Sequence, residues 1–119
     1  MRYRMVVTRE DGAWLASAAG VAGAHTESDD VRSLDRYARE VCTLADGAGE
    51  HAMADCEFEW VFEVSDADLA AAAAEARGVS VAEVLAQGWS LADVAALLDV
   101  PATRVTHVPP RGGAHIAHG

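Results

Sequence analysis

The segment CEFEWVFEV, residues 56–64, alternates large apolar residues with glutamates. This period of two is typical of a strand with one buried face and one exposed face. The apolar members, which we expect to face a core, are Cys56, Phe58, Trp60, Phe62 and Val64. The other face carries Glu57, Glu59 and Glu63. The segment therefore predicts a strand with a strongly acidic outer face.

An amphipathic helix is predicted before this strand, over DDVRSLDRYAREVCTLAD at 29–46. Its apolar residues recur at steps of three and four positions and form one stripe. Ser28, Asp29 or Asp30 can cap its first turn. A strand, a helix and a second strand in this order favour a parallel crossover packed on one face of a sheet.

Two further strands are predicted upstream, RYRMVVTRE at 2–10 and AWLASAA at 13–19. The EDG sequence at 10–12 is a hairpin signal between them. A bend marked by Gly20 and Gly23 then leads to a short third strand around 25–26. If the strand at 56–64 lies beside the first strand, its glutamates come close to the outward-facing arginines 2 and 4.

The segment WSLADVAALLDVPATRVTHV, residues 89–108, has the apolar spacing of a helix-turn-helix. Asp99 would occupy the tight turn, and Pro101 would begin the second helix. The residues expected in the core of this unit are Val94, Leu98, Val100, Val105 and Val108. Ala95 is expected where the two helices approach closely and a large side chain would clash. The exposed face of the second helix would contact DNA, and its residues are Thr103, Arg104, Thr106 and His107.

An alanine-rich helix and two short helix starts are predicted from Ser65 onward. DADLAAAAAEARG, after Ser65, has a high helix propensity and ends at Gly78. Two serine-acid pairs follow at the spacing of a capping box. These pairs are Ser80 with Glu83, and Ser90 with Asp93.

The formal net charge of the 119 residues is -10. Neither half shows the basic surface that a strong stand-alone DNA binder needs, whereas an acidic surface suits a basic protein partner. No long apolar run and no leader-like start are present, so we expect a cytoplasmic protein without a membrane segment. Cys42, His51 and Cys56 lack a nearby fourth ligand, which argues against a zinc site.

The stretch YRMVVTREDGAWLASAAGVAGAHTESDDVRSLDRYAREVCTLA resembles the HicB antitoxin family, and the resemblance covers about residues 2–64. It implies an α+β fold, a β-β-β-α-β partial RNase H-like sheet with one packed helix and no nuclease site. In this family a C-terminal DNA-binding motif is common, which agrees with a small all-α helix-turn-helix-like segment. The domains expected are therefore 1–64, 65–110 and a flexible tail at 111–119.

The resemblance implies an antitoxin that neutralises a small basic HicA-like ribonuclease toxin and represses its own operon. DNA binding would in turn favour a homodimer, because a dimer doubles every contact and matches a palindromic operator. We expect Glu57, Glu59 and Glu63 to contact the toxin. Two alternatives remain open, a solitary DNA-binding regulator and a scaffold protein that binds no nucleic acid. No catalytic arrangement, metal or cofactor is expected, because no nucleophile-base or paired-carboxylate pattern has convincing spacing.

Overall fold

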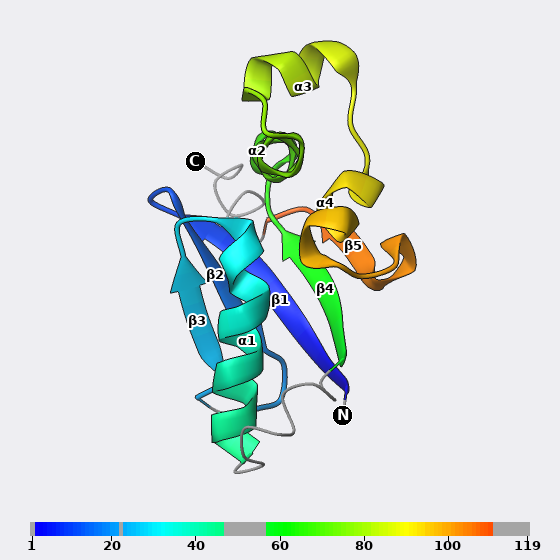
Figure 1. Cartoon of the computed structure of the whole chain (residues 1–119). Coiled ribbons are helices and arrows are strands. Elements are labelled where there is room, and N and C mark those ends of the chain that lie inside the picture. The colour runs from blue at the N-terminus through cyan, green and yellow to red at the C-terminus, as the bar shows by residue number, and fades with distance from the viewer. Residues whose placement is uncertain (1, 22, 47–56, 111–119) are drawn as a thin grey trace.

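The structure is a computed structural model that describes residues 2–21, 23–46 and 57–110, with the backbone alone for residue 2 and residues 41–46. These residues form an α+β fold with a five-stranded mixed sheet and four α-helices (Figure 1). The strands are β1 (Arg2–Glu10), β2 (Ala13–Ala18), β3 (His25–Ser28), β4 (Glu57–Glu63) and β5 (Val105–Val108). The helices are α1 (Val31–Asp46), α2 (Asp66–Arg77), α3 (Val81–Gln87) and α4 (Leu91–Leu98).

The strand order across the sheet is β3-β2-β1-β4-β5. Strand β2 runs antiparallel to both of its neighbours, whereas β1, β4 and β5 are parallel. The predicted hairpin and the predicted parallel crossover are both confirmed. Asp11 and Gly12 connect β1 to β2 with φ values of 51° and 82°, the left-handed conformation that a two-residue hairpin turn requires.

Helices α1 and α4 pack on the same face of the sheet, α1 over β2 and β3 and α4 over β5 (Figure 1). The largest buried side chains of the core are Trp14, Phe58, Trp60 and Phe62. Leu98 of α4 belongs to the same hydrophobic cluster as these sheet residues. One core therefore contains residues from both sides of the boundary expected at residue 64.

The N-terminus of α1 is capped by two acidic side chains. Asp30 Oδ1 accepts a hydrogen bond from the Ser33 N–H at 2.8 Å, as a capping residue does. The carboxylate of Glu75, which belongs to α2, accepts from the N–H groups of Val31 and Arg32 at 2.9 Å each. The second cap ties α2 to the start of α1, and sequence spacing gave no sign of it.

Most helix boundaries downstream agree with the sequence. Ser65 Oγ accepts from the Asp68 N–H at the start of α2, and Gly78, with φ 68°, ends that helix. Helix α4 ends at Asp99, which has φ 57° and ψ 47°. The left-handed turn predicted at Asp99 is confirmed.

The prediction of a second helix in the helix-turn-helix is wrong. Ala102–Arg104 form a single 3₁₀ turn, and Val105–Val108 form β5, paired in parallel with Trp60–Glu63 of β4. Three of the four residues of β5 are β-branched, which favours strand over helix. Val105 is 4% exposed in its place next to Trp60. Its apolar side chain therefore reaches the core from a strand.

Several predictions lie outside the described residues. These are the side chain of Cys42, residues His51 and Cys56, and the tail at 111–119. The apolar stripe of α1 is described as far as Ala38, and Val31, Leu34 and Ala38 are fully buried in it.

Candidate functional surface

One face of the sheet is left uncovered by the helices that the structure describes. Side chains alternate along each strand, so the residues between the core positions point to this second face. Arg4, Ser17, His25 and Glu59 are exposed on it. We call this surface, formed by the outward-pointing residues of β1 to β5, the open face.

The strand registers place the residues of the open face in rows across the sheet. One row contains no carboxylate and consists of His25, Ser17, Val6, Val61 and Thr106. The next row has Glu27, Leu15 and Thr8 on β3, β2 and β1, followed by the neighbouring pair Glu63 and Val108. The open face therefore has an uncharged band beside a row with a glutamate near each end.

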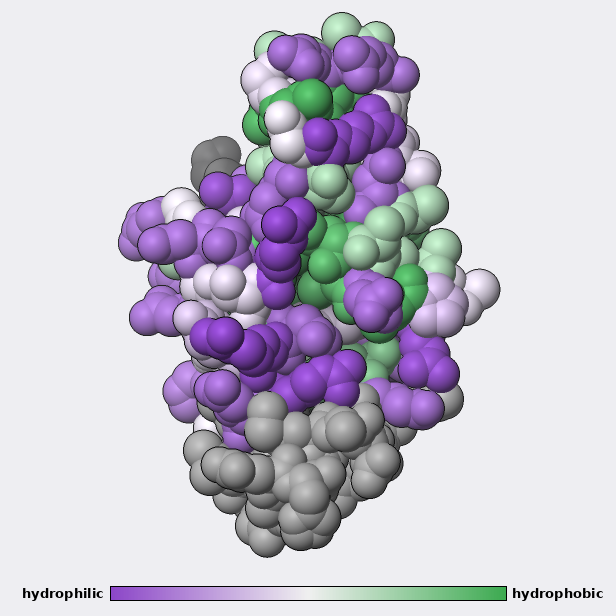
Figure 2. Space-filling model, in the orientation of Figure 1, coloured by the Kyte–Doolittle hydropathy of each residue, from purple (hydrophilic) through white to green (hydrophobic). Residues whose placement is uncertain are grey.

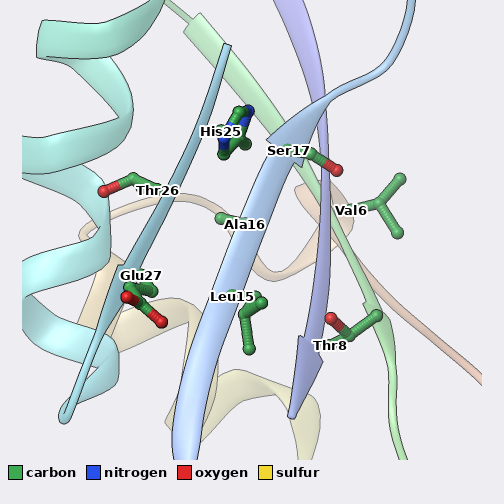
Figure 3. A pocket seen from close by; sticks show the side chains of 8 residues that line it. All are labelled: Val6, Thr8, Leu15, Ala16, Ser17, His25, Thr26 and Glu27. Carbon is green, nitrogen blue, oxygen red and sulfur yellow. The ribbon is translucent and has the colours of Figure 1, made fainter. Parts of the chain in front are cut away.

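A shallow hollow of about 640 Å³ lies on the open face over β1, β2 and β3 (Figure 3). Six of its eight lining residues belong to the two rows just described, and Val6 and Leu15 are the apolar ones among these six. Thr8, Ser17, His25 and Glu27 supply polar groups around them. The other two, Ala16 and Thr26, pair with each other between the rows. This hollow was not predicted from the sequence, although the apolar Val6 and Leu15 at outward-facing positions of two amphipathic strands were a signal for it.

The predicted partner-binding glutamates all lie on the open face. Glu57 and Glu59 are exposed and Glu63 is partly buried on β4. Arg4 pairs in register with Glu59, as expected from the sequence. Each of the three glutamates also takes part in interactions within the chain, so their charge is not presented to solvent in isolation.

The predicted DNA-binding residues do not share one face. Thr103 is exposed on the 3₁₀ turn, and Thr106 is exposed on the open face. His107 points to the opposite side of β5, where its Nε2 lies 2.8 Å from the carbonyl oxygen of Val64. Arg104 Nη2 lies 3.8 Å from Glu57 Oε2, so it joins the edge of the acidic surface.

The helix-covered side of the molecule exposes both hydrophilic and hydrophobic regions. Figure 2 shows hydrophilic residues over α1 and a hydrophobic patch beside them over α4. Partly buried apolar residues of this region include Leu91, Leu97 and Val100. Farther out, α3 exposes 61% of Leu85.

An ion pair fixes the start of α4 against α2. Arg77 Nη2 donates to Asp93 Oδ2 at 2.8 Å, and Arg77 Nη1 donates to the Gly88 carbonyl at 2.9 Å. Asp93 Oδ2 also accepts from the Ser90 N–H at 3.0 Å, as in the predicted capping box. The hydrogen bonds from Arg77 and then from Ser90 lower the pKa of Asp93 below its usual 3.8. These contacts join α2 to the start of α4.

Among the described residues, no three His, Cys, Asp or Glu side chains are grouped so that they could hold a metal ion. None of the described helices has both the length and the apolar character required to cross a membrane. Comparison with protein-family models, curated proteins and solved structures finds no match to this chain.

Proposed function

We propose that this chain is a non-catalytic binding module of the HicB antitoxin type, which binds and neutralises a small basic ribonuclease-type toxin of the HicA kind. The observation that carries the proposal is the open face, an uncovered sheet surface with four glutamates on β3 and β4. Complementary potentials accelerate encounter and fix the register of two proteins. A basic partner is therefore the one that this surface suits best.

The proposed RNase H-like character of the sheet has support from its order of elements. Three strands, one helix and a fourth strand follow one another, with β4 beside β1. This is the β-β-β-α-β arrangement that the resemblance to HicB implies. Strand β5 extends that sheet by one position.

Operator binding has less support than partner binding. A helix-turn-helix reads bases with its second helix, and the corresponding residues here form a short turn and a strand. Arg104, the strongest candidate for a base contact, faces Glu57. Operon repression and the homodimer remain predictions, and the observations do not favour the solitary regulator.

The test is pull-down of the tagged chain from nuclease-treated lysate of its native host, with identification of the bound proteins and assay of their ribonuclease activity. We expect one small basic ribonuclease at equal stoichiometry, inhibited by the wild-type chain. The combined variant Glu57→Lys, Glu59→Lys and Glu63→Lys should release it, because the surface charge is reversed.

The matched control reverses three exposed acids away from the open face, Glu40→Lys, Asp66→Lys and Glu83→Lys. Its change in net charge is the same, so it should still bind the ribonuclease. If both triple variants bind equally well, the open face is not the partner surface. If no basic ribonuclease is recovered, the antitoxin function is contradicted.

A further inference from the structure

The hollow on the open face differs from the charged surface around it. Val6 and Leu15 are half-buried there, and Val61, next to Val6 on β4, is only 7% exposed. Val6 and Val61 are neighbours in the uncharged band, and Leu15 lies on β2 in the adjoining row. Binding energy at protein interfaces is concentrated where a large side chain enters such a pocket.

Carboxylates lie on both sides of this apolar centre. Glu27 pairs in register with Leu15 on one side, and Glu63 follows the Val7–Phe62 pair of β1 and β4 on the other. Three strand spacings separate β3 from β4, which corresponds to about 14 Å. An apolar group over β1 and β2 would therefore have Glu27 and Glu63 about 5–10 Å away on either side. Long basic side chains can span this distance.

From this geometry we infer that the hollow receives one large apolar or aromatic side chain of the basic partner, flanked in the partner by arginine or lysine residues that reach Glu27 and Glu63. The inference rests on the function proposed above and names the residue type that would give the interaction its specificity. The apolar anchor supplies affinity, and the flanking charges fix its orientation.

A second copy of this chain fits the hollow poorly. With a net charge of -10, two copies would bring glutamates against glutamates. The most exposed large apolar side chain among the described residues is Leu85 on α3. Its helix carries Glu83 and no basic residue, so charge opposes its docking on the open face.

The experiment measures binding of the full chain to three labelled synthetic peptides by fluorescence anisotropy. The first peptide has one tryptophan flanked by lysines, the second replaces the tryptophan by alanine, and the third replaces the lysines by glutamates. We expect saturable binding of the first peptide and binding weaker by about tenfold or more for the other two. Amide chemical shifts of Val6, Leu15 and Ser17 should move during the titration.

Two variants and one control test the location. Ser17→Trp fills the hollow from an exposed position, and Leu15→Glu places a charge in it. Leu85→Glu makes the same chemical change on α3, away from the open face. Both hollow variants should lower the affinity for the tryptophan peptide by about tenfold, whereas Leu85→Glu should leave this affinity unchanged. Circular dichroism verifies that each variant is folded. If Leu15→Glu does not fold, Ser17→Trp alone tests the location of the site.

Equal binding of the tryptophan and alanine peptides would overturn the inference, as would an effect of Leu85→Glu equal to that of Ser17→Trp. If Ser17→Trp has no effect while the Glu57, Glu59 and Glu63 reversal abolishes binding, the result supports the proposed acidic contact and contradicts the anchor site. If Ser17→Trp blocks binding and the reversal does not, the result supports the anchor site and contradicts the proposed acidic contact. A dimer in sedimentation that Ser17→Trp dissociates would assign the hollow to a second copy and overturn the inference.

Discussion

Asp93 links two parts of the helical region through a single carboxylate. Its bonds to Arg77 and to the Ser90 N–H favour the ionised form and hold its pKa below 3.8. We expect Asp93→Asn to lower the free energy of unfolding at pH 7 by about 1 kcal/mol, the usual value of a helix cap with a surface ion pair. Urea denaturation followed by circular dichroism measures it.

The pH dependence of that loss follows from the direction of the shift. A carboxylate with a depressed folded-state pKa stabilises the protein above its unfolded pKa and loses this effect as the pH falls through the folded value. The difference between wild type and Asp93→Asn should therefore be full above about pH 5 and shrink below pH 4. Hydrogen bonds from Ser33 also lower the pKa of Asp30, so the wild type should lose stability in the same acidic range. A difference that stays constant from pH 7 to pH 3 would contradict this assignment.

Asp99 has a backbone conformation that suits glycine better than aspartate. Its φ of 57° and ψ of 47° lie in the left-handed region, where a Cβ atom is unfavourable. We expect Asp99→Gly to raise the free energy of unfolding by about 0.5–1 kcal/mol, because C′ positions of helices favour glycine. Asp99→Ala is the matched control and should not stabilise. Equal stabilities of the glycine and alanine variants would contradict the strain.

At the scale of elements, α1 depends on a cap from α2. Glu75 Oε1 and Oε2 accept from two unpaired N–H groups of the first turn of α1, where a negative charge is also favoured by the helix dipole. We expect Glu75→Gln to destabilise the chain by about 1 kcal/mol in urea denaturation. Glu83→Gln, an exposed position on α3, should change little. If the two variants lose equal stability, the cap contributes nothing.

Strand β5 and the alternative helix differ in where they place two valines. In a helix, Val105 and Val108 would share one face, whereas in β5 they point to opposite faces of the sheet. Val105 is 4% exposed and Val108 is only half-buried on the open face. We expect Val105→Ala to cost about 2 kcal/mol and Val108→Ala less than half as much, measured by thermal denaturation. Equal losses would favour the helix.

At the scale of the whole molecule, the sheet and the helical segment share one core. Leu98 of α4 is 2% exposed and clusters with Trp14, Trp60 and Phe62 of the sheet. Leu98→Ala should therefore destabilise the entire chain by about 2–4 kcal/mol. Tryptophan fluorescence, which reports mainly on the sheet, and far-ultraviolet circular dichroism should show coincident transitions. Two separate transitions would indicate that residues 65–110 unfold independently.

Local patterns were sufficient for much of this fold. The alternation in 2–10, 13–18 and 57–63 and the helical period of 31–38 depend only on which neighbours are apolar, and all four elements are confirmed. The turns at Asp11, Gly78 and Asp99 were also predicted, since each has a residue type that tolerates a left-handed backbone. The acidic outer face of β4 follows from the same alternation. These strands, this helix and these turns depend on residues that are near one another in the sequence, so they could be predicted from it.

Local sequence did not decide the state of residues 105–108 or the form of the candidate site. The apolar spacing of Val105 and Val108 fits a helix as well as a strand. The β-branched residues favour a strand, and the available edge of β4 beside Trp60 gives that strand a partner. The cap from Glu75 joins residues 44 positions apart along the chain, too far for any local pattern. The hollow likewise requires Val6, Leu15 and Glu27 from three strands, which become neighbours only through the register of the sheet. Contacts between distant segments depend on the packing of the whole chain, so they could not be obtained from its sequence alone.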